Sequence, residues 1–485
     1  MRTKEKSPEK LARAEKRRQR EIAKWEREKA RPRRKYYLVY LVFIISLIYI
    51  TDEVASQIGT LMKTEIANDL FERFGQSSVG VLDILGMVVV PFQALAIFYK
   101  PLADRLGRKL FLIINTFGMS VAMLLIFLSD SVALYAVGAC MVQFFIPHDM
   151  QVVYIMESAP PKHRARIYSA IKFVANMGVM LIPLLRRLLM DEASQWRRVY
   201  LVPAVLGLVA CSVALLLARE TDAFIDSRLS YLNMSEAQRA EEKRRKSVEN
   251  AQGGVFAALK FAMSHRQLRW LYIVGALANV GFITTLNYQV ILSYGYAESL
   301  VNAGLFADLG KLTMDYVSVH QVTSALFMFP VGCAFSQVIM GFISDSRGRK
   351  AAAVTTACNC LVAFIGFTLG AKLGWEPYLT GFLCGACIGS YYSTNDVIIM
   401  MIGESAPTNL RSSIMSAEFV VVALGVVVSY GVSLPLITLL GNEVTWIVAF
   451  ALTVPGFAAA LAAMVMKTHD TKGIDLEKVT GSEWD

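Results

Sequence analysis

Charged residues are scarce in this chain of 485 residues, and cysteines are missing from the loops where they would form structural disulfides. Only 18% of the residues are charged, whereas 55% are hydrophobic, and the mean hydropathy is +0.46. All seven cysteines fall within long apolar runs, so no disulfide framework is expected. These values exclude an ordinary soluble protein.

Recognisable catalytic and nucleotide-binding motifs are also missing. The chain has no glycine-rich ATP-binding loop, which argues against a primary pump. No nucleophile–base pair and no set of metal ligands stands out, so we expect no enzyme, no metal site and no cofactor. Cys384 and Cys387 form a CxxC pattern, but inside an apolar run this pattern indicates packing.

Apolar runs of membrane-spanning length make up most of the chain. A helix that crosses a bilayer needs about 20 mostly apolar residues. Twelve such runs lie at 37–62, 79–99, 110–129, 131–157, 166–190, 197–218, 268–295, 318–343, 351–371, 375–403, 412–438 and 443–466. The sequence therefore predicts an all-α membrane protein with twelve transmembrane helices.

Composition divides the chain into five parts. They are a basic N-terminal tail (1–36), a six-helix half (37–218), a polar linker with short helices (219–265), a second six-helix half (266–466) and a polar C-terminal tail (467–485). The N-terminal tail has a net charge of +10, which equals that of the whole chain. Because Lys and Arg collect on the cytoplasmic side of membranes, both ends are expected to be cytoplasmic, with the basic tail as a topology anchor near anionic lipid.

Cations are few in the loops expected on the opposite side. These loops carry Lys63, Arg73, Lys311 and Lys372. The exception is the loop between the fifth and sixth spans, with Arg186, Arg187, Arg197 and Arg198. Asp191 and Glu192 lie between these arginines and predict local ion pairs, with an anion-attracting mouth as the alternative.

Two charged motifs occur once in each half. The stretch ESAP begins at Glu157 and again at Glu404, followed seven residues later by Arg164 and Arg411. A D-x-x-G-R-K element occupies the turns after the second and eighth spans, with Asp104, Arg105, Gly107 and Arg108 in one copy and Asp345, Gly348 and Arg349 in the other. Such duplicated landmarks indicate a transporter built from two related halves. We expect these residues to form an inside gate in which the ESAP glutamates pair with nearby arginines.

With these motifs the chain resembles the major facilitator superfamily, whose signature in the same turns is G-x-x-x-D-R-x-G-R-K. The ESAP segments, Glu220-Thr221 after the sixth span and Asp470-Thr471 in the C-terminal tail resemble the sugar-porter and organic-ion-transporter branches. This resemblance implies two six-helix halves around a central cavity. It also implies that the inner glutamates and arginines form gate salt bridges.

The sugar-porter pattern is incomplete in the seventh span. Leu277 and Ala278 stand where sugar porters carry a glutamine pair, and Ile283 stands where they carry an asparagine. A sugar needs several hydrogen-bond partners to offset its lost hydration, so a solute of different chemistry is expected. The candidates for the substrate cavity are Asn279, Asn287, Gln289, Tyr391, Tyr392 and Lys172.

Ionisable residues inside spans are costly and usually face a cavity or a partner. Asp52 and Glu53 lie near the middle of the first span, and adjacent residues do not share a helix face. One of them is therefore expected to face the cavity and the other a neighbouring helix. The resemblance favours Asp52 as a proton-binding carboxylate, with a purely structural pair as the alternative. Further candidates for proton coupling are His148, Asp149 and Asp396, although the two aspartates also suit a gate network.

The sequence thus predicts a monomeric secondary transporter of the plasma membrane, embedded in lipid. Its partners are expected to be a small organic solute and protons, not nucleic acid. The excess of buried acids over buried bases favours a cationic or neutral solute. Alternatives are a drug or metabolite exporter working as a proton antiporter, a sugar:proton symporter, or a non-transporting membrane receptor on the same fold.

Overall fold

The computed structural model describes most of the chain as helix. The described residues are 8–30, 37–99, 106–145, 154, 157–158, 171, 174–175, 177–235, 237–239, 241, 255–407, 410–474 and 483. Across these residues the chain forms helices and turns without any β-strand. The expected all-α fold is confirmed.

The first half consists of helices that follow the predicted spans. They are α2 (Tyr37–Leu61) with its continuation α3 (Lys63–Leu70), α4 (Ser78–Tyr99), α6 (Arg108–Phe127), α7 (Val132–Phe145), α10 (Leu181–Leu189) and α11 (Arg197–Leu217). Two short 3-10 turns, η1 (Glu72–Ser77) and η3 (Ala193–Trp196), lie in the connections.

The second half repeats this arrangement with longer helices. They are α15 (Arg266–Asn279), α16 (Phe282–Asn302), α17 (Lys311–Val317), the π-helical turn η4 (Ser318–Val322), α18 (Thr323–Arg347), α19 (Arg349–Lys372), α20 (Pro377–Ser405), α21 (Arg411–Leu440), the 3-10 turn η5 (Asn442–Val444) and α22 (Thr445–Lys467).

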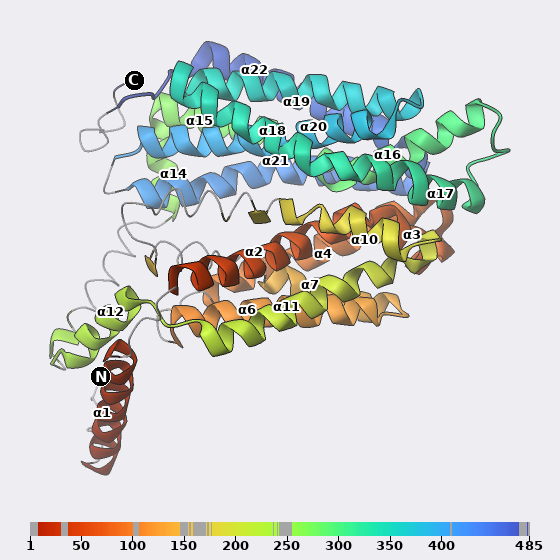
Figure 1. The fold of residues 1–485 in the computed structure, drawn as a ribbon. Helices are drawn as coiled ribbons and strands as arrows, with labels where there is room; N and C mark the ends of the chain where they lie inside the picture. Colours follow the sequence, from red (N-terminus) through yellow and green to blue (C-terminus); the bar gives the residue numbers. More distant parts are fainter. Residues whose placement is uncertain are drawn as a thin grey trace.

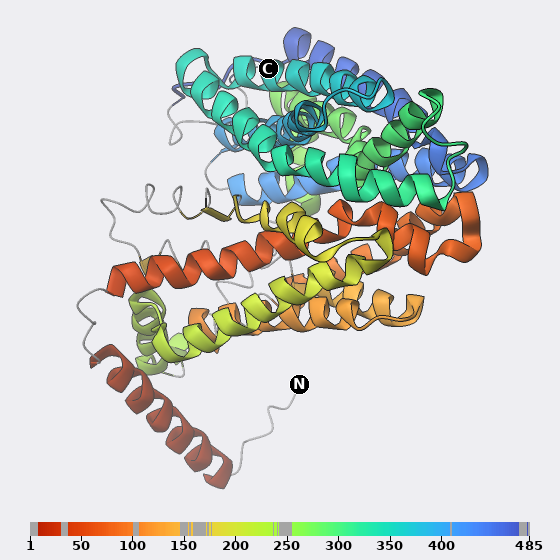
Figure 2. The ribbon, with the colours of Figure 1, turned by 45° about the vertical axis from the view of Figure 1, so that its right-hand side comes forward.

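The two halves lie side by side, with their long helices running in the same general direction (Figures 1 and 2). The end of α22 lies at one end of this bundle, together with α12 (Asp222–Asn233), α14 (Val255–Ser264) and α1 (Pro8–Ala30). We call this the inner end. The opposite end, which carries α3 and α17, is called the outer end.

Eight helical stretches in the described part are long and apolar enough to cross a membrane, and Val132–Phe145 is a shorter apolar helix. Some helices extend beyond their predicted spans because polar residues continue them outside the apolar core. The seventh predicted span, 268–295, is a stretch from 266 to 302 that is interrupted at Val280 and Gly281. A Cβ at Gly281 would lie 3.2 Å from Thr453 Cα, so the absence of a side chain lets α22 pass closely at the interruption.

Helices α18 and α20 touch along a glycine stripe. Gly381, Gly385 and Gly389 recur every fourth residue of α20 and share one face. A Cβ at Gly381 would overlap with the Ala325 carbonyl oxygen, and one at Gly385 with the Phe329 carbonyl oxygen. The two backbones therefore lie in direct contact, as small residues permit in membrane helices.

Candidate functional site

A cavity of about 360 Å³ lies between the two halves. Helix α2 contributes Glu53 and Gln57 to its wall. Helix α18 contributes Phe329, Pro330, Cys333, Ala334 and Gln337, and α20 contributes Ile388, Gly389, Tyr392 and Asp396. The fold thus brings a carboxylate from the first half and one from the second half to a common space, beside an exposed tyrosine ring.

The adjacent carboxylates of α2 have different surroundings. Glu53 is half-buried and lines the central cavity, whereas Asp52 is only 8% exposed and is not part of the cavity wall. The sequence resemblance favoured Asp52 as the proton-binding group. Helix rotation instead gives Glu53 the position facing the cavity. Of the other proton-coupling candidates, Asp396 lines the same cavity, while His148 and Asp149 lie outside the described residues.

The remaining cavity candidates from the sequence lie elsewhere. Tyr391 and Asn279 are buried inside the second half, where the Tyr391 hydroxyl donates to Asn279 Oδ1 at 2.5 Å. Asn279 Nδ2 donates in turn to Asn395 Oδ1 at 2.8 Å. Asn287 and Gln289 are fully buried at the outer end, and Lys172 lies outside the described residues.

At the inner end of the first half, the ESAP glutamate joins the start of α6 to the residue that precedes α12. Arg108 Nε lies 3.3 Å from Glu157 Oε1, and the Thr221 hydroxyl donates to Glu157 Oε2 at 2.5 Å. Glu220 accepts the backbone N–H groups of Arg108 and Lys109 at 2.9 and 3.1 Å. Burial raises the pKa of the Glu220 carboxyl, and its hydrogen bonds to backbone N–H groups oppose this shift.

The second half builds the same network from its own residues. Arg349 Nε lies 3.1 Å from Glu404 Oε1, and the Thr471 hydroxyl donates to Glu404 Oε2 at 2.5 Å. Asp470 accepts the Lys350 backbone N–H at 2.9 Å, in the place that Glu220 occupies in the first half. Each ESAP glutamate is thus tied to the turn before it in the chain and to the segment that follows the last helix of its half.

A glycine is required at the centre of each inner network. Gly107 has φ = 104° and Gly348 has φ = 105°, values that disfavour residues with a side chain. A Cβ at Gly107 would also overlap with the Glu220 carboxylate, and one at Gly348 with the Asp470 carboxylate.

The remaining residues expected in the inside gate do not contact the ESAP glutamates in the described part of the chain. Asp345 lies 3.3 Å from Arg349 on the surface, and Arg411 donates to the Ala406 carbonyl at 3.2 Å. Asp104, Arg105 and Arg164 lie outside the described residues.

Buried hydrogen bonds join the two halves at the outer end. We call this region the outer seam. Arg186 of α10 pairs with Glu65 of α3 at 2.6 Å, and neither side chain is exposed. Across the seam, Arg186 donates to Thr323 Oγ1 at 3.1 Å and to the Ser318 carbonyl at 3.0 Å. Gln289 of α16 donates to Glu65 Oε2 at 3.1 Å and accepts from the Thr64 hydroxyl.

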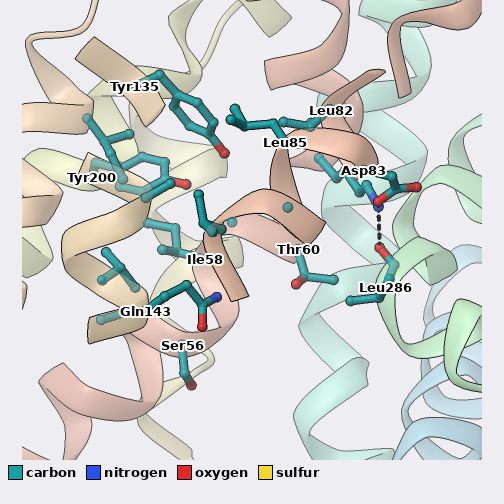
Figure 3. Close-up of a pocket in the computed structure, with 18 of the residues that line it drawn as sticks. Ser56, Ile58, Thr60, Leu82, Asp83, Leu85, Tyr135, Gln143, Tyr200 and Leu286 are labelled. Carbon is teal, nitrogen blue, oxygen red and sulfur yellow. Dashed lines mark hydrogen bonds and ion pairs between the residues drawn. The ribbon is translucent and has the colours of Figure 1, made fainter. Parts of the chain in front are cut away.

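A second buried ion pair, between Lys63 of α3 and Asp83 of α4, lies in the same seam. Lys63 Nζ donates to the Leu286 carbonyl of α16 at 3.0 Å, and Asn287 donates to Asp83 Oδ2 at 3.2 Å. The pair borders a cavity of about 160 Å³ that is lined mainly by the first half, with Leu286 and Tyr430 contributed by the second. Figure 3 shows Asp83 and Leu286 on one side of this cavity and Tyr135, Tyr200 and Gln143 on the other.

These contacts correct two sequence expectations. Lys63 was expected in a loop on the outside. It lies at the outer end, but in the helix α3 that continues the first span past Met62, and it is only 6% exposed. Arg186 and Arg197 were expected to pair locally with Asp191 or Glu192. Arg186 instead pairs with Glu65, and Arg197 Nη1 lies 2.5 Å from Asp69.

The mouth outside the seam is not an anion-attracting one. A hollow of about 600 Å³ there has a mostly acidic lining, with Glu65, Asp69, Glu72, Asp308, Asp315 and Glu443 against Lys311. Sequence reasoning missed the seam because its partners lie far apart in the chain: 121 residues separate Glu65 from Arg186. The only available signal was the presence of Glu65 and Asp83 in or beside apolar runs.

Comparisons with known proteins are consistent across sequence and fold. A family model described as Major Facilitator Superfamily matches residues 36–417. Mouse solute carrier family 2, facilitated glucose transporter member 7, is 27% identical over 192 residues, which cover 35% of each protein. Human member 7 is 33% identical over 173 residues, 33% of each protein. The chain therefore spans about a third of the length of the curated relatives it matches.

Solved structures match over nearly their full length. The crystal structure of a D-xylose-proton symporter has a TM-score of 0.57 and 16% identity, covering 90% of this chain and 99% of that one. A bacterial homologue of the human lysosomal transporter Spinster gives 0.56 and 14%, covering 89% and 95%. The nucleoside transporter NupG gives 0.57 and 14%, covering 87% and 99%. These similarities establish the shared fold.

Proposed function

Since this chain belongs to the Major Facilitator Superfamily, we propose that it is a secondary active transporter that moves a small organic solute by alternating access. The observation that carries the proposal is the central cavity, to which α2 of one half and α18 and α20 of the other contribute polar side chains. Such a site between two related halves suits a solute that is released to one side at a time. The family assignment also supports a transporter rather than an enzyme.

The outer seam and the inner networks serve as the two gates in this proposal. The seam holds the halves together at the outer end, so the cavity is closed on that side. Each inner network lies within one half, around Glu157 or Glu404. Closing the inner end requires the two networks to approach each other while the seam separates.

Proton coupling is assigned to the carboxylates of the cavity, Glu53 and Asp396. A charged group at membrane depth costs about 2.5–3.5 kcal/mol unless it is paired or protonated. Opening the cavity to one side or the other changes its hydration, and with it the affinity for a proton. A difference in proton affinity between the two states is what coupling requires. Asp52, which is buried beside Glu53, remains a second candidate.

Sugar is the second candidate substrate. The relatives described as facilitated glucose transporters and the neighbour described as a D-xylose-proton symporter favour it. Gln57, Gln337 and Tyr392 in the cavity wall offer the amide and hydroxyl groups that hydroxyl-rich solutes need. Against it stand Leu277 and Ala278 in place of the sugar-porter glutamine pair. A proton-driven exporter of drugs or metabolites uses the same cavity in the opposite direction.

We place the protein in the plasma membrane as a monomer surrounded by lipid, with both ends cytoplasmic. The position of α1 and of the end of α22 at the inner end, together with the basic N-terminal tail, supports this orientation.

The test is transport by proteoliposomes. A thermal-shift screen of the purified protein against sugars, nucleosides, organic cations, organic anions and amines first identifies a solute. We expect Glu53→Gln and Asp396→Asn each to lower accumulation driven by a pH gradient at least about tenfold, since coupling is lost, while exchange without a gradient persists.

The matched control is Asp130→Asn, which removes an exposed carboxylate from the connection between α6 and α7, outside the cavity wall, and is expected to accumulate solute like the wild type. Accumulation with the wild-type pH dependence in both cavity variants would show that protons couple elsewhere, with Asp52 tested next.

A further inference from the structure

The N-terminal helix α1 is fixed to the transporter through one face. Trp25, 5% exposed, packs edge-on against Phe224 of α12 with ring centroids 5.3 Å apart. Glu21 accepts Arg228 at 2.6 Å, and Lys29 pairs with Asp226 at 2.6 Å. These contacts define which side of α1 is covered and hold the helix in a set orientation.

Helix α1 extends past the edge of the bundle at its inner end. In Figures 1 and 2 the helix runs across the inner end rather than along the long helices, and it projects beyond the first half. For a bundle that crosses a bilayer, this location is the level of the lipid headgroups beside the protein.

The uncovered side of α1 carries a continuous basic stripe. Successive residues of an α-helix turn by about 100°. On that spacing six exposed cations fall within an arc of about 100° that begins beside the docking face. They are Arg13, Lys16, Arg17, Arg20, Lys24 and Arg27. Glu15 and Glu26 lie on the opposite side and Glu28 lies just outside one edge of the arc, so the arc between Arg13 and Arg27 itself contains cations only.

We propose that this basic stripe binds the anionic surface of the bilayer that surrounds the transporter. Charge complementarity identifies the partner, because phosphatidylserine-type headgroups attract clustered Lys and Arg within a Debye length. Two large apolar residues of the helix, Trp25 and Ile22, pack in the cluster with α12, so binding is electrostatic without deep insertion. The inference does not depend on the solute or on proton coupling.

Lipid binding by α1 also affects the inner gate. Helix α12 begins at Asp222, directly after Thr221, which bonds the ESAP glutamate Glu157. Lipid that holds α1 therefore also steadies the segment from which Thr221 and Glu220 reach the first inner network.

The experiment is hydrogen–deuterium exchange of the full-length protein in nanodiscs, read at the peptides of α1. Discs of phosphatidylcholine are compared with discs containing phosphatidylserine. We expect the serine lipid to slow exchange in α1 at least about tenfold, because several cations engage the surface together. The effect should disappear in 1 M salt, where the Debye length is about 3 Å.

Two variants separate the stripe from net charge. One replaces all six stripe cations with Gln and should lose the lipid effect. The other keeps the net charge but moves cations to the opposite side, with Arg13→Gln, Arg20→Gln, Lys24→Gln and Arg27→Gln combined with Glu15→Lys and Glu26→Lys. It should lose most of the effect. Equal exchange in both kinds of disc, or full lipid protection in the relocated variant, would overturn the proposal.

Discussion

The outer seam depends on individual charged side chains that lie out of reach of water. Lys63 and Asp83 have side-chain exposures of 8% and 5%, and Arg186 and Glu65 have none. Removing two charges from water is costly, and the cost is recovered only when each keeps its partner. The seam is therefore stable while both members of each pair are charged and in place, and it is sensitive to the loss of either one.

Asp83→Asn is expected to weaken the seam, because it leaves the Lys63 ammonium buried without a countercharge. Breaking a buried pair costs about 3–5 kcal/mol. The melting temperature in detergent should fall. A cysteine introduced at Thr60, on the wall of the adjoining cavity, should react faster with a membrane-impermeant thiol reagent added from the outer side.

The control for this variant removes both charges, as Lys63→Met with Asp83→Leu, and should regain most of the lost stability. If Asp83→Asn leaves both the melting temperature and the labelling rate at wild-type values, the pair does not hold the seam.

The sequence shows the charged residues of the inner networks and of the outer seam, but not which residues they pair with. Glu157 and Glu404 were visible because their motif is repeated within a short stretch. Arg186 was assigned to neighbours in the chain, since the sequence shows only local proximity, and its actual partner Glu65 lies on another helix. The choice between Asp52 and Glu53 was open for a related reason: it depends on the rotation of α2 against the other half.

At the scale of helices, apolar length and repeated motifs predicted most of the architecture, whereas interruptions and close contacts were not predictable. The break between α15 and α16 at Val280 and Gly281 lies within a single predicted span. The glycines of α20 show in the sequence only as small residues that permit a close helix contact. Which helix packs against that stripe is a tertiary property, and the structure shows that it is α18.

The glycine stripe makes a prediction about stability. Gly385→Ala introduces a methyl group where the Phe329 carbonyl oxygen lies, so α18 and α20 must separate. We expect a loss of about 1–3 kcal/mol, as for overpacked cores, measured as a lower denaturation midpoint in detergent.

Gly431→Ala in α21 is the matched control, because nothing lies within 4 Å of its added Cβ. Alanine is the better helix former, so this variant should be unchanged or more stable by up to about 1 kcal/mol. A loss of similar size in Gly431→Ala would show that the contact with α18 does not determine the effect.

At the scale of the whole molecule, the two halves are joined through the seam and must separate there during transport. Ser77 of the first half donates to the Thr438 carbonyl of the second at 2.7 Å, and Asn442 accepts the Val79 backbone N–H at 3.1 Å. Rigid-body movement of one half against the other requires these bonds to break.

A disulfide across the seam should therefore stop transport. Cysteines at Ser77 and Thr438, oxidised after reconstitution, are expected to lower solute exchange at least about tenfold, and a reductant should restore it. The control pair is Thr284 and Thr453, whose hydroxyls lie 2.6 Å apart within the second half. Cross-linking that pair should leave exchange near the wild-type rate. Full exchange with the seam cross-linked would show that the halves do not part at this end.

Each inner network is built from residues of one half, which suits a chain made of two related copies. Among the described residues, the contacts of Glu157 with Arg108 and Thr221 lie within the first half, and those of Glu404 with Arg349 and Thr471 lie within the second. A chain of half this length would contain the same kind of inner contacts. It would lack the space between two copies, which exists only when two halves associate. In a chain made by fusing two copies, the seam residues of the halves are free to differ, in keeping with Arg186 and Gln289 meeting around Glu65 without a repeated motif.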